Sequence, residues 1–150
     1  MKPAKNKSTQ IAIIVALGGF LFGFDASVIS GVTSFIVPEF NLNAILQGWA
    51  VASLTLTSTL AMLTAGPLSD RWGRKPVLLL TGLLFALSAL GSALAPTFNV
   101  LILARLIGGL AVGASLILAP IYIAEMAPTH LRGRLVSINQ LNIVFGFAAA

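Results

Sequence analysis

The feature that most constrains this chain is a series of long apolar segments separated by short polar connections. Each segment has about the 20 residues that an α-helix needs to cross a bilayer. The segments cover residues 11–37, 45–67, 77–95, 98–124 and, from Leu135 onward, the rest of the chain to Ala150. A backbone inside lipid must satisfy its own hydrogen bonds, so these segments are predicted to be helices. The sequence therefore predicts an all-α transmembrane protein with four complete spans and a fifth that is cut.

Composition supports lipid as the solvent of most of this surface. Hydrophobic residues make up 57% of the chain and charged residues only 9%, whereas soluble domains carry about a quarter charged residues. The chain contains no cysteine, which excludes disulfides and thiolate metal sites. We expect no enzyme, no metal and no organic cofactor, and we expect a chain that is the N-terminal piece of a longer protein.

The basic residues predict the orientation of the spans. They lie before the first span, between the second and third, and between the fourth and fifth: Lys2, Lys5, Lys7, Arg71, Arg74, Lys75, Arg132 and Arg134. The other two connections, PEFNLN and APTFN, contain neither Lys nor Arg. The positive-inside rule then places residues 1–10 in the cytoplasm as a tail that precedes a bundle over 11–150. The basic pI needs no nucleic-acid partner, and the expected location is the plasma (cell inner) membrane, as a multi-pass protein.

Two charges, Asp25 and Arg105, remain at membrane depth. Each costs about 2.5–3.5 kcal/mol to insert alone, so each needs a partner or a water-filled cavity. At about 1.5 Å per residue, Asp25 lies roughly 20 Å above the inner face and Arg105 roughly 10 Å below the outer face of a layer of about 30 Å. If spans one and four are neighbours, the two charges can pair. Arginine stays charged, so Asp25 is the member that can take and release a proton. The alternative is a static ion pair that only fixes helix packing.

The connection GPLSDRWGRK, between spans two and three, carries charge and turn residues together. Gly66 and the following proline are expected to loosen the end of span two, and Gly73 permits a tight reversal. Asp70 is expected to cap a helix N-terminus or to pair with Arg71 or Arg74.

The connection IAEMAPTHLRGRL joins spans four and five. Glu125 closes span four and Arg132 opens span five, so the two are expected either to bridge or to pair with groups in the missing half. His130 is the only histidine of the chain and is expected to be a surface residue.

Glycines and amides mark the helix contacts. Gly19 and Gly23, like Gly109 and Gly113, have the four-residue spacing that lets helices approach closely in lipid. In span five, Asn139 and Asn142 share a face while Gln140 points elsewhere. Amides at this depth serve as interhelical contacts or as partners of a hydroxylated ligand, and position alone leaves both readings open.

These motifs together resemble a known family. GPLSDRWGRK is similar to the GxxxDRxGRR/K loop motif of the major facilitator superfamily, and ARLIGGLAVG to its RxxxG motif in helix four. GFLFGFDASVISG, PIYIAEMAPTHLRGRL and INQLNIVFG resemble the sugar porter family, including bacterial proton-linked xylose transporters. The resemblance runs from about residue 11 to the end of the chain.

The resemblance implies a twelve-helix fold in two six-helix halves, of which this chain is the N-terminal four to five helices. It also implies a sugar site at midplane between the halves, and inverted three-helix repeats under which helices one and four are equivalent. It implies that Asp25 carries the proton and that Arg105 modulates it. Phe22 and Gln140 match sugar-contacting positions, and Ile143 lines the pocket one turn on. The cytoplasmic gate and its salt-bridge network correspond to Gly66, Asp70, Arg71, Gly73, Arg74, Lys75, Glu125 and Arg132.

The function implied is secondary active transport of a sugar, with symport of a proton by alternating access. The partners are then a monosaccharide, the bilayer and the missing C-terminal half, with the proton as coupling ion. Phe147 stands where some members place a second sugar-binding glutamine, and some facilitators keep an aspartate at the position of Asp25. Alternatives are therefore facilitative uniport by the same fold, efflux of drugs or other solutes, and a sugar sensor that does not transport.

Overall fold

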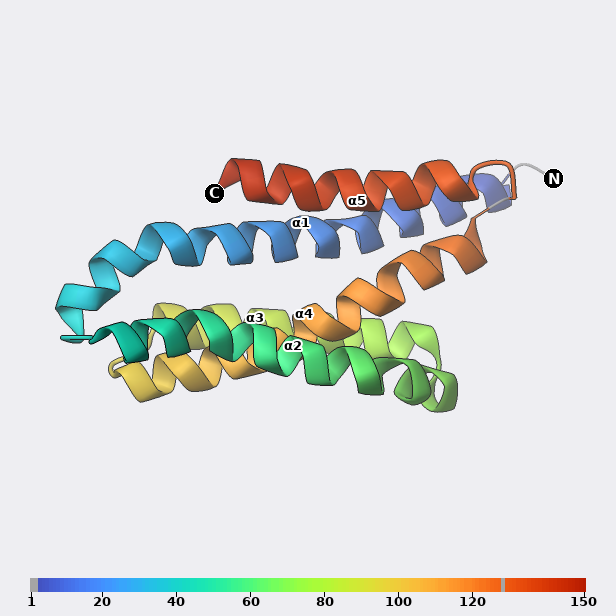
Figure 1. The fold of residues 1–150 in the computed structure, drawn as a ribbon. Coiled ribbons are helices and arrows are strands. Elements are labelled where there is room, and N and C mark those ends of the chain that lie inside the picture. The colour runs from blue at the N-terminus through green and yellow to red at the C-terminus, as the bar shows by residue number, and fades with distance from the viewer. Residues whose placement is uncertain (1–2, 128) are drawn as a thin grey trace.

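Five helices, α1 to α5, make up the computed structural model, which describes residues 3–127 and 129–150, and the side chains of residues 15, 17–127 and 129–150. The helices are α1 (Pro3–Glu39), α2 (Ala44–Trp72), α3 (Arg74–Ala93), α4 (Phe98–Met126) and α5 (Arg132–Ala149) (Figure 1). Among the described residues, four helices are long and apolar enough to cross a membrane, namely α1 to α4. The predicted all-α transmembrane fold is confirmed. The fifth predicted span is a helix, but its three amides and its basic first turn lower its hydropathy.

The helices alternate in direction. In Figure 1, α1, α3 and α5 run one way and α2 and α4 the other, so the N-terminus and the connections α2–α3 and α4–α5 lie at one end. The arginines and the lysine of 71–75 and the arginines of 132–134 therefore gather at that end, which the positive-inside rule makes cytoplasmic. Glu39 and the α3–α4 connection lie at the opposite, outer end.

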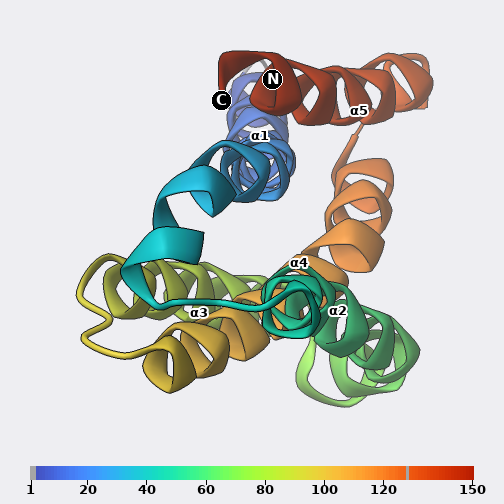
Figure 2. The same ribbon diagram turned by 60° about the vertical axis from the view of Figure 1, so that its left-hand side comes forward.

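Helix α4 is the centre of the bundle. It packs along α2 and α3, while α1 packs along α5, and the second half of α4 crosses to the α1–α5 pair (Figure 2). Thirteen of its residues are buried, because the four other helices all contact it and its small side chains allow close approach. Helices one and four are thus neighbours, as pairing of Asp25 with Arg105 requires.

Glycines set the two closest crossings. A Cβ at Gly113 would collide with the backbone of Ser58 on α2, and a Cβ at Gly23 would collide with the carbonyl oxygen of Ile143 on α5. Gly146, on α5, faces the backbone of α1 in the same way. The two predicted small-residue motifs therefore do bring helices close, each against a different partner: α1 against α5, and α4 against α2.

Two helices extend past the apolar spans that the sequence predicts. Helix α1 already begins at Pro3, within the segment expected as a tail, because Lys, Ala and Gln are good helix formers and an aqueous flank tolerates helix. The expectation that Gly66 loosens the end of α2 is wrong, since α2 continues through Pro67 to Trp72. Only Gly73 separates α2 from α3.

Gly73 makes this abrupt reversal possible. Its φ of +89° and ψ of 151° lie in a region that side chains rarely adopt. Its N–H donates to the carbonyl oxygen of Ser69 at 2.8 Å, which closes α2. Pro76 lies in the first turn of α3, where its missing N–H leaves no helical hydrogen bond unmade.

Candidate functional site

Asp25 and Arg105 line the same cavity, of about 320 Å³, between α1, α3 and α4. Asp25 is half-buried, and Arg105 is only 6% exposed. The charges attract each other across this space, although no hydrogen bond or contact ion pair joins them within the described part of the chain. Helix packing therefore brings together the two intramembrane charges that the sequence placed at one depth.

Arg105 carries an unusual feature at its buried end. Its Nε has no hydrogen-bond partner among the residues that the structure describes. A buried donor left unpaired costs about 1–3 kcal/mol, and more when it is charged. Arg105 thus lies in a site where the negative charge of Asp25 attracts it but where no described residue accepts a hydrogen bond from its Nε.

Phe22 and Ile143, two of the three predicted sugar-contacting residues, lie together where α1, α4 and α5 meet. They line a narrow cavity of about 10 Å³, shared with Ser115 and Asn139. Gln140, by contrast, is exposed on another face of α5, as its helical position predicts. The three residues therefore do not line one pocket within these 150 residues.

Two aromatic rings meet at this junction. Phe22 and Phe147 form an edge-to-face pair with ring centroids 6.0 Å apart and planes at 76°, a geometry that aromatic rings favour. Phe147, which the sequence singled out as a departure from the family pattern, thus contacts a predicted sugar-site residue directly. Phe147 therefore covers one side of the Phe22 ring with an apolar group.

Asn139 is an interhelical residue in this structure. It is 3% exposed, and its backbone and side-chain oxygens are what a Cβ at Gly19 of α1 would meet, each at 3.0 Å. Its Oδ1 has no partner in the described part of the chain. Ser115 lines the same small cavity and was not predicted from the sequence. The one feature that could have indicated it is a single hydroxyl in the apolar centre of α4.

Arg74 is the centre of the cytoplasmic ion pairs. Its Nη2 lies 3.0 Å from Oδ1 of Asp70, and its Nε lies 3.2 Å from Oε1 of Glu125. Its Nη1 donates to Oγ of Ser69 at 2.6 Å, a partner that sequence reasoning missed although it lies five residues earlier in the same motif. One guanidinium therefore joins the ends of α2 and α4 to the start of α3.

The remaining predicted gate residues lie outside this network. Arg71 and Arg132 are exposed and form no ion pair with any described acid. The expected ion pair between Glu125 and Arg132 is absent from the described residues. The last turn of α4 lies against the first residue of α3, so Glu125 pairs with Arg74 instead. Asp70 pairs with Arg74 and caps no helix N-terminus.

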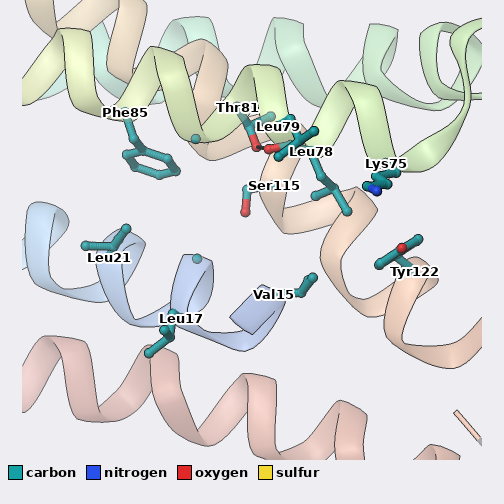
Figure 3. A pocket seen from close by; sticks show the side chains of 12 residues that line it. Val15, Leu17, Leu21, Lys75, Leu78, Leu79, Thr81, Phe85, Ser115 and Tyr122 are labelled. Carbon is teal, nitrogen blue, oxygen red and sulfur yellow. Dashed lines mark hydrogen bonds between the residues drawn. The ribbon is translucent and has the colours of Figure 1, made fainter. Parts of the chain in front are cut away.

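Lys75 lies beside a second cavity, of about 430 Å³, between α1, α3 and α4 (Figure 3). Leu17 and Leu21 of α1 line it together with Leu79 and Phe85 of α3. Its walls are mostly apolar. Of the predicted site residues, it therefore includes only Lys75.

The fold is that of an N-terminal portion of a major facilitator transporter. The structure superposes on the proton:xylose symporter XylE bound to 6-bromo-6-deoxy-D-glucose with a TM-score of 0.86, at 34% identity over 97% of this chain and 36% of that one. It also superposes on the inward-open xylose transporter XylE from E. coli with a TM-score of 0.84, at 36% identity over 93% of this chain and 37% of that one.

The chain belongs to the sugar (and other) transporter family, whose sequence pattern matches residues 11–150. It is 47% identical to the D-xylose transporter of Levilactobacillus brevis over 90% of this chain. It is 37% identical to the arabinose-proton symporter of Escherichia coli K12 over the whole of this chain. It spans 30% and 32% of the lengths of these two relatives. The chain thus matches about a third of the length of multi-pass sugar transporters.

Proposed function

We propose that this chain is the N-terminal portion of a sugar:proton symporter that works by alternating access. The observation that carries the proposal is that Asp25 and Arg105 line one cavity inside the membrane-spanning bundle. Relatives that are a proton:xylose symporter and an arabinose-proton symporter support it.

Asp25 is the proposed proton carrier. Its carboxylate accepts a proton from water on the outer side, becomes a neutral carboxylic acid and releases the proton on the inner side. Arg105 stays charged throughout, so its field favours the carboxylate and resists protonation. A conformational change that alters the distance between them, or the access of water, then couples protonation to that change.

The proposed sugar site lies about one turn along α1 from Asp25, toward the cytoplasmic end. Phe22 would present its ring to the apolar face of the sugar, with Ile143 beside it and Phe147 against the ring of Phe22. Gln140, exposed on α5, would offer an amide to sugar hydroxyls in the complete protein. The substrate class proposed is a monosaccharide.

The cytoplasmic ion pairs are the proposed gate. Arg74 ties Asp70 of α2 to Glu125 of α4 at the end that the basic connections assign to the cytoplasm. Contacts present in one orientation and broken in the other bias the equilibrium between the two orientations.

The test is Asp25→Asn in the full-length protein, assayed in vesicles for sugar accumulation and for sugar counterflow. The variant keeps its shape but cannot exchange a proton, so accumulation should fall to equilibration while counterflow continues. Glu39→Gln is the matched control, because Glu39 is an exposed acid at the outer end of the same helix. Accumulation that survives in Asp25→Asn would refute the proposed role. A wild-type protein that only equilibrates its sugar is a uniporter.

The sugar site is tested separately with Gln140→Ala. Loss of hydrogen bonds to the sugar should weaken its affinity about tenfold. Affinity unchanged for xylose, arabinose, glucose and galactose would remove Gln140 from the site, without bearing on Asp25.

A further inference from the structure

The cavity that Asp25 and Arg105 share extends well beyond the two charges. Its walls also include Ser92, near the outer end of α3, and Phe40 and Ala95, which lie in the two outer connections. The cavity therefore reaches from the two intramembrane charges to the outer end of the bundle.

The polar groups of this cavity suit water. Asp25 supplies acceptors, Ser92 a hydroxyl, and Arg105 the Nε that has no partner among the described residues. A buried water needs two to four polar partners, and each water occupies about 30 Å³ of the liquid. A volume of about 320 Å³ thus has room for about ten water molecules.

This cavity is distinct from the one that Phe22 and Ile143, two of the predicted sugar-contacting residues, line. Phe22 and Ile143 line the separate small cavity against α5, and Gln140 is exposed on α5. Asp25 therefore lines the cavity nearer the outer end, between α1, α3 and α4, while Phe22, about one turn nearer the cytoplasmic end, lines the cavity between α1, α4 and α5.

Among the residues that the structure describes, Arg105 is the only charged group besides Asp25 that lines this cavity. The α3 residues that line the cavity are uncharged: Ala89, Ser92 and Ala93. The α1 residues that line it are apolar except for Asp25. The protonation of Asp25 is therefore governed within the described bundle by Arg105 and by the water that reaches it.

We propose that this cavity is the outer proton entry path to Asp25, separate from the path of the sugar. The inference rests on the proposed symport. Water molecules along α3 relay a proton inward past Ser92. The carboxylate of Asp25 accepts that proton and becomes a neutral carboxylic acid, and release of the proton on the cytoplasmic side restores the carboxylate.

Cysteine accessibility tests the path without relying on transport. These 150 residues contain no cysteine, so Ala89→Cys and Ser92→Cys are introduced into the full-length protein with any other cysteines replaced. Ala86→Cys is the control, because Ala86 is an exposed α3 residue outside the lining of this cavity. Silver ions are added from the outside, and their reaction with the thiol is read as loss of later maleimide labelling after denaturation.

A thiol reacts as thiolate, which requires water. We expect silver to modify Ala89→Cys and Ser92→Cys at least about tenfold faster than Ala86→Cys. Equal rates at all three positions, whether fast or slow, would overturn the inference.

Flux measurements then link the path to coupling. Ala89→Leu narrows the cavity, so sugar-driven proton uptake should slow about tenfold while sugar counterflow stays near that of wild type; Ala86→Leu should change neither. If Ala89→Leu takes up protons as fast as the wild-type protein, the cavity is not the proton entry path, even if the protein is a symporter. Absence of proton uptake in the wild-type protein would instead refute the proposed function, and the silver reaction would still report on the cavity.

Discussion

Removal of the Arg74 guanidinium should weaken the cytoplasmic end of the bundle more than removal of any other charge there. Arg74→Gln eliminates the ion pairs to Asp70 and Glu125 and the hydrogen bond to Ser69. Arg71→Gln removes the same charge from the same motif, and Arg71 is exposed with no ion pair to a described acid. The pair of variants therefore separates specific contacts from net charge.

The magnitude follows from exposure. The side chain of Arg74 is 26% exposed, against 68% for Asp70 and 49% for Glu125, so each ion pair contributes about 0.2–1 kcal/mol. The charged hydrogen bond to the buried Ser69 adds about 1 kcal/mol. We expect Arg74→Gln to lower the free energy of unfolding by about 2 kcal/mol and Arg71→Gln by less than about 0.5 kcal/mol.

The assay is reversible unfolding of the full-length protein by SDS in mixed micelles, with Glu125→Gln and its combination with Arg74→Gln completing a double-mutant cycle. If the network exists in one orientation only, 2 kcal/mol shifts the equilibrium between orientations by about thirtyfold. Equal destabilisation by Arg74→Gln and Arg71→Gln, with no coupling to Glu125, would refute the reasoning.

Backbone contacts give further predictions for the same protein. Gly113→Ala places a methyl group against the backbone of Ser58, so it should destabilise the bundle by about 1–3 kcal/mol, measured by thermal unfolding in detergent. Gly31→Ala has no atom within 4 Å of the added Cβ and should be neutral or stabilising by up to about 1 kcal/mol; if the two behave alike, the crossing is not close. Gly73→Ala forces a side chain to adopt φ +89° and should cost about 1–3 kcal/mol; an unchanged unfolding temperature would contradict this strain.

Much of the fold could be predicted because the bilayer imposes simple rules. The lengths of the apolar segments gave helices close to those observed, and the basic connections gave their alternating direction. The depth of Asp25 and Arg105 could be estimated from helical rise, and the cavity that they share followed once α1 and α4 packed together. Motif spacing likewise predicted which glycines would lie at helix crossings.

The parts that could not be predicted depend on packing at atomic distance. Two arginines, Arg71 and Arg74, lie within four residues of Asp70 in the sequence, and either could pair with it. The chain reversal at Gly73 decides between them, because it turns Arg74 toward the end of α4. Glu125 pairs across 51 positions of sequence, a contact that no local pattern specifies. The sequence left open whether the amides of α5 contact other helices or a ligand. The close approach of α1 to α5 buries Asn139 as an interhelical contact and leaves Gln140 exposed.

The most direct test of proton coupling is sugar-driven proton movement in vesicles that contain the purified full-length protein and an internal pH indicator. Addition of xylose or another transported monosaccharide outside, with no other driving force, should acidify the interior of wild-type vesicles. The same addition should leave the internal pH unchanged with Asp25→Asn. Sugar entry without acidification in the wild-type protein, or with equal acidification in Asp25→Asn, would contradict the assignment of Asp25 as the proton carrier.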